Sequence, residues 1–519
     1  MYSDTQNDSK HGFLSTFMDD GKFIALLLVF ASLFFIFISQ SIPPGGGPDA
    51  ATFLSAYLDI APGAALFRTF LSSWIVGTLA GLGAYTFHLS LLLLYLLYLL
   101  AAYYTARLLG LYQARIVTVL LLFHFQVTVL FHQLASDNLM ALFLVLWSAL
   151  VVRLYEKNQA STYAILGFAT FLVVIVRPSG ILFGFCALIP VVTHGFNKKN
   201  MIYCVVFLSV FVGSILGYAS LNLYRNAQFF LAPASNMFPG VMIYMNGMMD
   251  RSAGPNSEKI FALVERELLD NPPYSQLDIN VETFFSHPDV RSFFDLTFID
   301  TVFDEGIMRR AAFEVVFKNP GSFFMTWMKK IYFMLIHYQT LGLAISGDAG
   351  SVMGITGLAK TKQNGIPHTF RSTLEGQEKS REHDAAVIKR WKERHSDPQE
   401  YDRLEADYKK RLLRLHFELG GYMPSLFTNT FLNTLLPPML FFFLVGIPLI
   451  LQWRKRQVRL ILTMFIPAFG IVMLSSAYTA HPAIALYRMP IDFFFILVGV
   501  GGLMSSRFLK GLFLSSPST

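Results

Sequence analysis

Long apolar segments alternate with short polar connections over most of the chain. They lie near residues 23–39, 85–106, 116–131, 138–155, 163–176, 180–195, 201–222, 431–451, 458–477 and 490–506. Most are close to the ~20 residues that a helix needs to cross the hydrocarbon core of a bilayer. The pattern predicts an all-α polytopic membrane protein with about ten transmembrane helices, within a range of about eight to thirteen.

The apolar segments fall into two groups separated by a long polar insertion. We expect an N-terminal transmembrane module over residues 1–222, with a first outer loop over residues 40–84. A large loop region follows over residues 223–427, and a C-terminal transmembrane module over residues 428–519. Within the loop region we expect an interfacial helix over residues 320–345 and a charged helical hairpin over residues 373–418.

Basic residues occupy the short connections, and the strongest cluster lies within residues 454–459. If these connections are cytoplasmic, as the positive-inside rule predicts, both termini are cytoplasmic and the number of spans is even. A further span over residues 323–343 would move the strongest cluster to the outside. We therefore interpret that segment as an interfacial or re-entrant helix, or as one member of a pair of spans.

The end of the large loop region is highly charged but balanced. Between Thr373 and Glu418 there are eleven acidic and eleven basic residues. This balance does not favour a nucleic-acid surface. Pairs at helical spacing predict exposed helices with side-chain ion pairs, and a turn at Ser396-Asp397-Pro398 joins them. These pairs are Glu375/Lys379, Glu405/Lys409 and Asp407/Arg411.

The composition agrees with a membrane protein. Hydrophobic residues make up 54% of the chain and charged residues 14%, which excludes an ordinary soluble domain. The net charge of +7 follows from the basic connections, so nucleic acid is not an expected partner. Both cysteines, Cys186 and Cys204, lie in apolar segments, and no disulfide is predicted. No removable signal peptide is evident, and the first span is expected to remain as an anchor.

Two glycine pairs and two acidic residues stand out. Gly77-x-x-x-Gly81 and Gly213-x-x-x-Gly217 have the spacing of closely packed membrane helices. Asp49 follows the Pro- and Gly-rich segment after the first span and precedes an amphipathic stretch. A carboxylate at the membrane surface can act as general base for an acceptor hydroxyl, although a solvated turn aspartate is the simpler interpretation.

Asp137 opens the fourth apolar segment. It precedes Asn138-Leu139-Met140-Ala141, so its simplest role is to cap the helix that begins there. It is also a second acidic candidate for chemistry, because it can orient an acceptor or support Asp49. Both interpretations stay open.

Several short motifs follow one another along the chain. They are Gly47-Pro48-Asp49 followed by Tyr57, Arg68 with Phe70, the segment His132–Asp137, Arg177-Pro178-Ser179-Gly180, the segment Asn222–Phe230, Asn319-Pro320-Gly321-Ser322-Phe323, and Tyr487-Arg488-Met489-Pro490. Their order resembles the polytopic glycosyltransferases of the C-type fold, in particular the bacterial branch related to protein mannosyltransferases and aminoarabinose transferases. The family usually has a proline after the arginine of its second loop helix, where this chain has Thr69.

The resemblance implies transfer of a monosaccharide from a polyprenyl-phosphate donor to an acceptor hydroxyl on the outer face of the cell inner membrane. It implies Asp49 as the general base, with Asp137 as a second acidic residue. Cations would bind the departing lipid phosphate. The substrate-binding candidates are Arg68, Arg177, Tyr487, Arg488, Lys329 and Lys330.

Each cation also has a structural interpretation. The arginines can extend to lipid headgroups, Arg488 can pair with Asp492, and Lys329 and Lys330 can anchor a helix at the membrane surface. The chain has no zinc-type spacing, Walker loop or dinucleotide motif. No metal site is predicted, and a divalent ion shared by Asp49 and Asp137 is left open.

The acceptor is open among a glycan, a lipid and a protein, and so is the sugar. Two other functions share this layout: a transporter or lipid flippase, and a polysaccharide polymerase or ligase. A transporter would usually show internal repeats and ionisable residues at mid-membrane.

Overall fold

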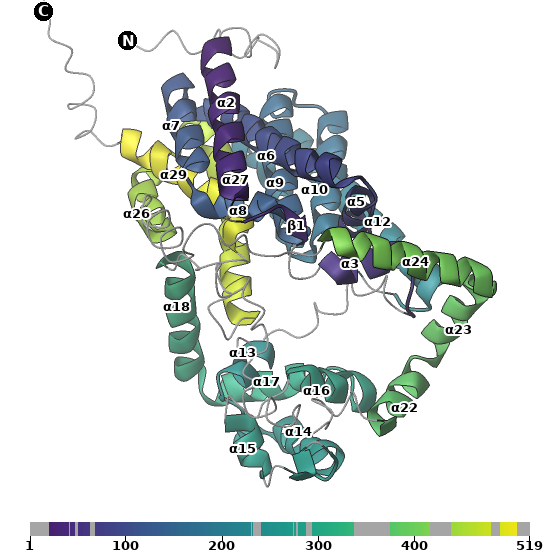
Figure 1. Ribbon diagram of the computed structural model, residues 1–519. Coiled ribbons are helices and arrows are strands. Elements are labelled where there is room, and N and C mark those ends of the chain that lie inside the picture. The colour runs from purple at the N-terminus through teal and green to yellow at the C-terminus, as the bar shows by residue number, and fades with distance from the viewer. Residues whose placement is uncertain are drawn as a thin grey trace, which may run out of the picture.

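The structure, a computed structural model, describes residues 20–40, 42–46, 50–62, 68–229, 231, 240–272, 274–276, 279–286, 293–336, 374–415, 437–478 and 488–505. Apart from one pair of two-residue strands, its regular elements are helices, so the predicted all-α class is confirmed over these ranges. Figure 1 shows a helical bundle, a group of short helices below it, and helical segments that join the two.

The N-terminal part of the chain builds most of the bundle, and each expected apolar segment is helical there. Two short strands, β1 (Gly45–Gly46) and β2 (Gln133–Leu134), lie between these helices. The helices are α2 (Gly21–Ser39), α3 (Ala50–Leu58), α5 (Phe70–Ala80), α6 (Ala84–Ala106), α7 (Leu111–Leu122), α8 (Phe125–His132), α9 (Ser136–Leu154), α10 (Ala160–Val176), the 3-10 helix η4 (Pro178–Leu188), α11 (Ile189–His194) and α12 (Lys198–Asn226).

The described C-terminal ranges complete the bundle with α26 (Met439–Ile450), α27 (Arg456–Tyr478), the 3-10 helix η11 (Met489–Ile491) and α29 (Asp492–Ser505). Glycines let α26 and α29 approach closely. A Cβ on Gly502 would lie 2.0 Å from the carbonyl oxygen of Val445, and one on Gly499 would lie 2.7 Å from the Phe442 ring. Since lipid supplies no hydrophobic force between helices, such close approach is how they gain packing energy.

Five described helices are long and apolar enough to cross a membrane, and six if α7 and α8 form one bent span. The five are Gly21–Ser39, Ala84–Leu109, Ser136–Leu154, Lys198–Asn226 and Arg456–Ser476. The remaining expected spans correspond to shorter apolar helices of 10–17 residues. The chain therefore has the helices that a membrane protein requires, and the figure of about ten spans stays a prediction.

Helices between residues 240 and 318 form a compact lobe with its own hydrophobic core. Its core residues include Phe261, Phe284 and Phe285, all nearly inaccessible to solvent. Its helices are α13 (Gly240–Met245), α14 (Pro255–Val264), the π-helix η7 (Glu265–Leu269), α15 (Val281–Ser286), α16 (Phe293–Phe298), the π-helix η9 (Ile299–Phe303) and α17 (Ile307–Lys318).

Helix α18 (Pro320–Ile336) connects the lobe to the bundle. The indole of Trp327 donates hydrogen bonds to the carbonyl oxygen of Met473 and the hydroxyl of Ser476, both at 2.9 Å. α18 covers the described part of the expected interfacial segment, and residues 337–345 lie outside the described ranges. Whether this segment lies at the interface stays a prediction.

Three charged helices run from the lobe to the bundle, and we call them the strap: α22 (Leu374–His383), α23 (Ala385–Arg394) and α24 (Pro398–Leu415). The predicted break between helices is present, because α23 ends at Arg394 and α24 begins at Pro398. The predicted pairs Glu405/Lys409, at 2.8 Å, and Asp407/Arg411, at 2.7 Å, are present too. The side chain of Glu375 lies outside the described set. The strap does not form the helical hairpin that we expected. Helices α22 and α23 extend from the lobe toward the bundle, and α24 then lies along the bundle (Figure 1). It lies there because its apolar face packs on α3 and α5.

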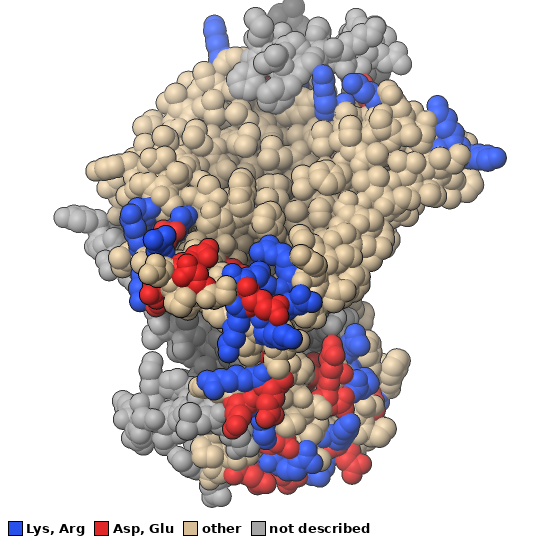
Figure 2. Space-filling model, turned by 90° about the vertical axis from the view of Figure 1, so that its right-hand side faces the viewer, with Lys and Arg blue, Asp and Glu red and all other residues tan. Residues whose placement is uncertain are grey.

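The end of the bundle away from the lobe is basic, as Figure 2 shows. There Arg456 donates hydrogen bonds to the carbonyl oxygen of Tyr155, at 3.0 Å, and to the ring of His194, at 2.7 Å. Arg115 pairs with buried Asp20 at the start of α2. Charges of both signs cover the strap and the lobe instead.

Candidate functional site

The two short strands join the first loop to the start of α9. Gly45 pairs with Gln133 and Gly46 with Leu134 in a parallel register. Gly46 has no room for a side chain, because a Cβ there would lie 2.7 Å from the Cβ of Ala50 and 2.9 Å from the carbonyl oxygen of Leu415. The pairing therefore holds the N-terminal end of α3 beside the segment that leads to Asp137.

Asp137 and Arg177 form an ion pair at this end of the bundle. Arg177 has an extended backbone between α10 and η4, as expected for a residue that precedes proline. Each side chain is about one-fifth exposed, with 17% for Arg177 and 21% for Asp137. The pair is accessible from outside without being fully solvated.

The expected capping role of Asp137 is wrong. Helix α9 begins at Ser136, two residues earlier than expected, so Ala135 is the N-cap residue and Asp137 lies in the first turn. The side chain of Asn138 takes the capping hydrogen bond instead and accepts it from the backbone N–H of Ala135 at 3.0 Å. Asp137 is thus available for Arg177, and its charge also suits the positive end of the helix dipole.

Arg68 lies beside the same junction. The hydroxyls of Thr69 and Ser72 donate hydrogen bonds to the carbonyl oxygen of Val176, at 3.0 and 2.6 Å. Thr69 follows Arg68 in the chain, and Val176 precedes Arg177. The hydrogen bond between Thr69 and Val176 therefore brings the backbone of Arg68 close to that of Arg177. Arg68 also donates to the hydroxyl of Thr52 on α3 at 2.7 Å, and its guanidinium lies 4.8 Å from the ring centre of Phe53.

Two of the predicted site residues lie outside the described ranges. Asp49 directly precedes Ala50, the first residue of α3, and Tyr487 directly precedes Arg488. The structure therefore describes the elements that flank Asp49 but not the aspartate.

Arg488 lies in the interior of the bundle and is fully buried. Its Nε donates to Asp492 at 2.7 Å, and its Nη1 donates to the carbonyl oxygen of Met334 on α18 at 2.6 Å. Gln126 accepts a further hydrogen bond from Nη2 at 3.2 Å, and His124 contacts the other oxygen of Asp492 at 3.0 Å. The internal pair with Asp492, one of the two interpretations of Arg488, is therefore present.

Lys329 and Lys330 lie on α18, on the opposite side of the view in Figure 1 from α3 and α5. Lys330 is buried, and this burial lowers the pKa of its amine to about 8. Lys329 lies over the Phe333 ring at 5.9 Å from its centre. The two lysines therefore lie on the helix that connects the lobe to the bundle, and not at the junction around Arg177.

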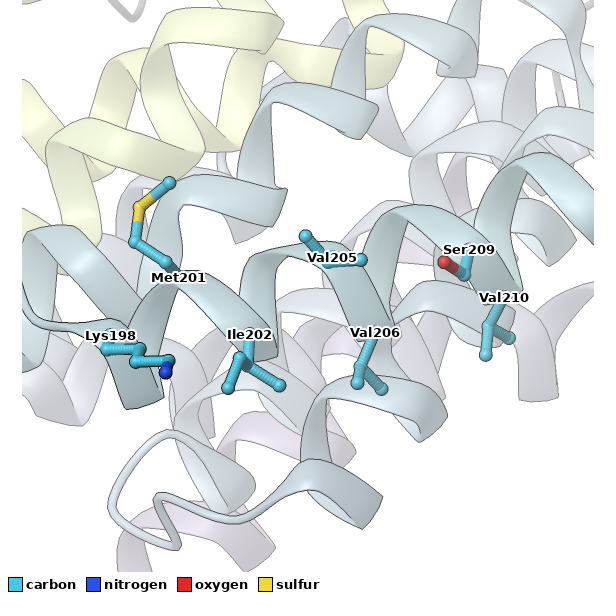
Figure 3. Close-up of a pocket in the computed structure, with 7 residues that line it drawn as sticks. All are labelled: Lys198, Met201, Ile202, Val205, Val206, Ser209 and Val210. Carbon is cyan, nitrogen blue, oxygen red and sulfur yellow. The ribbon is translucent and has the colours of Figure 1, made fainter.

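A shallow groove of about 410 Å³ follows the outward face of α12. Figure 3 shows aliphatic side chains along it, with Lys198 at one end and Ser209 near the other. It includes none of the residues at the Asp137–Arg177 junction. Its lining suits lipid chains, and it offers no group for catalysis.

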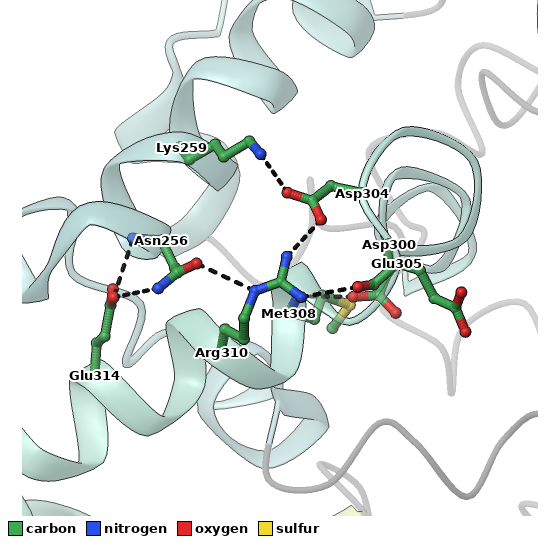
Figure 4. Close-up of polar contacts among 8 residues, drawn as sticks. All are labelled: Asn256, Lys259, Asp300, Asp304, Glu305, Met308, Arg310 and Glu314. Carbon is green, nitrogen blue, oxygen red and sulfur yellow. Dashed lines mark hydrogen bonds and ion pairs between the residues drawn. The ribbon is translucent and has the colours of Figure 1, made fainter.

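Charged side chains in the lobe hold its helices together (Figure 4). Glu314 accepts hydrogen bonds from the backbone N–H groups of Asn256 and Ser257, at 3.0 and 2.7 Å, and so satisfies the N-terminal turn of α14. Asp304 bridges Lys259, at 2.5 Å, and Arg310. Over the described residues, no three His, Cys, Asp or Glu side chains form a metal-binding group.

No family model, curated protein or solved structure matches the chain. The candidate site therefore depends on its own geometry.

Proposed function

We propose that the chain is a membrane glycosyltransferase that moves a monosaccharide from a polyprenyl-phosphate donor to an acceptor hydroxyl. One observation carries the proposal. At one junction β1 pairs with β2, and the hydroxyl of Thr69 donates a hydrogen bond to the carbonyl oxygen of Val176. It supports a single site made of the N-terminal end of α3, Arg68 and the Asp137–Arg177 pair, from segments far apart in the sequence.

The residues suit the chemistry of such a transfer. In this proposal Asp49 takes the proton of the acceptor hydroxyl as its oxygen attacks the anomeric carbon. Arg68 and Arg177 bind the lipid phosphate as its bond to the sugar breaks, because arginine forms paired hydrogen bonds to phosphate oxygens. Asp137 orients Arg177 and compensates its charge while no donor is bound. No metal ion is required for these roles.

The charge distribution supports an outward-facing site. The basic end of the bundle lies away from the lobe, and the positive-inside rule assigns such an end to the cytoplasm. The junction and the lobe would then face the outside of the inner membrane, where lipid-linked sugars of this type are used.

A mass-spectrometric comparison of envelope glycans and glycolipids, with and without the gene, tests the proposal. Loss of one sugar would identify both the residue transferred and its acceptor. In membranes supplied with a labelled polyprenyl-phosphate monosaccharide, Asp49→Asn is expected to lower transfer by about 100-fold or more. Asp402→Asn, which changes an exposed aspartate on α24, is the control and should retain the rate.

Full transfer by Asp49→Asn would exclude it as the base. If only sugar polymers lost length, a polymerase or ligase would be the better assignment.

The buried group around Arg488 favours a second candidate, a transporter. His124 lies at the break between α7 and α8, whose axes differ by 61°, and it contacts buried Asp492. Ionisable side chains at broken membrane helices are typical of transport sites. An unchanged glycome together with accumulation of a solute in the deletion strain would favour this alternative.

A further inference from the structure

A corner formed by the strap holds the far end of α3, the helix whose first residue follows Asp49. Asp59 lies just after α3, and its carboxylate Oδ2 accepts hydrogen bonds from Nε of Arg394 at 3.1 Å and from Nη2 at 2.9 Å. The ring of His395 contacts the same oxygen at 3.2 Å. Both of these guanidinium nitrogens bind the same oxygen, and hydrogen bonds between oppositely charged groups are stronger than those between neutral ones.

Two aromatic residues of the strap hold the backbone at the same place. The indole of Trp391 donates to the carbonyl oxygen of Asp59 at 2.8 Å, and the hydroxyl of Tyr401 donates to that of Ile60 at 3.3 Å. Arg394 also donates to the carbonyl oxygen of Arg225 at the end of α12. Four side chains, two from α23, one from α24 and His395 between them, thus fix the end of α3, and Arg394 also reaches α12.

The backbone of this corner is strained. Over the described ranges, two residues other than glycine have a left-handed backbone, Asp59 at φ 52° and Ala227 at φ 58°. Both lie here, since Ala227 follows Asn226, whose side-chain oxygen accepts a hydrogen bond from Arg394 at 3.4 Å. Such conformations persist where the surroundings hold them, and they gather at functional positions.

The rest of α24 follows α3 back toward the junction. The guanidinium of Arg411 lies 5.5 Å from the ring centre of Tyr57, and the last residue of α24, Leu415, lies against Gly46. α3 is therefore enclosed between α24 and α5, with the Asp59 corner at one end and Arg68 at the other.

We propose that Asp59 and Arg394 are positioning residues for the transfer site. Their contact sets the place of α3 and so the place of its first turn beside Arg68 and the Asp137–Arg177 pair. This inference rests on the proposed function, because it assigns the first turn of α3 to the reaction site. It adds a role for the strap, which the sequence had identified only as ion-paired helices.

The position of α3 can be measured without any activity. A cysteine at Ala51, in the first turn of α3, is labelled with a soluble maleimide in the full-length protein. The native cysteines, Cys186 and Cys204, are both buried. Asp59→Asn and Arg394→Gln are each expected to raise the labelling rate at position 51 by about tenfold, because α3 would leave its position more often.

Two further variants test whether the change in labelling rate comes from the contact between Asp59 and Arg394. Glu393→Gln changes an exposed neighbour of Arg394 and should leave the labelling rate as it is. The reciprocal exchange, Asp59→Arg with Arg394→Asp, remakes the ion pair without the contacts to Arg225 and Asn226, so it should recover part of the slow labelling rate. Variants that label fast only because they fold poorly would show no such recovery. Labelling of Asp59→Asn at the rate of the Glu393→Gln control overturns the proposal.

The rate of sugar transfer per folded molecule is the second readout. Asp59→Asn should lower the turnover of the labelled polyprenyl-phosphate monosaccharide by about tenfold or more, because misplaced groups react slowly. Faster labelling with unchanged turnover would show that the contact holds α3 without serving the reaction, and this outcome also overturns the proposal. If the unaltered protein transfers no sugar, the proposed function fails, while the labelling result still decides whether Asp59 holds α3.

Discussion

Arg488 shows what one buried cation does for the packing of this protein. It donates hydrogen bonds to Asp492 on α29, to the carbonyl oxygen of Met334 on α18 and to Gln126 on α8. The i, i+4 spacing of Arg488 and Asp492 predicted their pairing from the sequence. The contacts with Met334 and Gln126 could not be predicted, because those residues are more than 150 positions away.

Replacing Arg488 with methionine is expected to destabilise the protein by about 3–5 kcal/mol, because Asp492 would remain buried without its main partner. The thermal midpoint of the detergent-purified protein measures this loss. Adding Asp492→Leu should recover most of it, since a buried pair can often be replaced by apolar side chains. Arg454→Gln, at an exposed position, serves as the control. A double variant no more stable than Arg488→Met would contradict this account.

Helix α24 illustrates how an amphipathic element is fixed by the end of another helix. Arg411 donates to the carbonyl oxygen of Gly77 at 2.8 Å, and Arg414 donates to those of Ala80 and Gly81 at 3.0 and 2.8 Å. The last carbonyls of a helix have no partners within it, and cations suit this negative end. The sequence predicted a pair between Asp407 and Arg411, but not that the same arginine would reach α5.

The double variant Arg411→Ala/Arg414→Ala should weaken the docking of α24 by about 1–3 kcal/mol, since hydrogen bonds from charged groups are worth about that much. Hydrogen exchange of the α24 amides reports the effect directly. The exposed neighbour Lys410→Ala should exchange like the unaltered protein. Equal protection in the double variant would show that the apolar face alone holds the helix.

Among the described residues, the bundle and the lobe have separate hydrophobic cores. α18 and the strap connect them. At the lobe end of the strap, Lys379 pairs with Glu267 at 2.9 Å and lies 5.1 Å from the ring centre of Phe303. The lobe can therefore lose stability under conditions that the bundle withstands.

Acid should affect the lobe first. The hydrogen bond from Lys318 lowers the pKa of Asp250, and that from Lys259 lowers the pKa of Asp304. A lowered pKa contributes stability above the unfolded value of about 4, and this stability is lost as the pH falls through the lower folded value. Burial raises the pKa of Asp300, so the stability that this residue contributes decreases as the pH rises.

Protection factors of lobe amides, corrected for intrinsic exchange, should therefore fall below about pH 4 before those of the bundle. Asp304→Asn should reduce this acid dependence, whereas Glu305→Gln, at an exposed neighbour, should not. Simultaneous loss of protection in both cores would contradict the independence of the lobe.

The orientation of the molecule is open to a direct test. A cysteine at Glu305, exposed in the lobe, should react with an impermeant maleimide in intact cells. A cysteine at Lys455, exposed at the basic end, should react only after the membrane is opened. The reverse result would place the junction around Arg177 in the cytoplasm and exclude the proposed outward-facing site.

The apolar pattern alone predicted most helices of the bundle, although not α5, because residues that face lipid or a protein core must be apolar wherever the chain goes. It also predicted the close approach at Gly77, where a Cβ would lie 2.1 Å from the Tyr57 ring. The same spacing at Gly213 and Gly217 has open space around it among the described residues, and the tight glycines of α26 and α29 were not anticipated. Spacing along one helix does not reveal which face meets a neighbour.

The sequence by itself determined the helical class, the division into two apolar groups around a polar insertion, and the residue types available for chemistry. The tertiary structure decided which of them meet. It brings Arg68 and the Asp137–Arg177 pair to one junction, buries Arg488 and places α24 along α3. The reason is physical: apolar periodicity depends on local solvent exposure, whereas an ion pair across more than one helix depends on how the whole bundle packs.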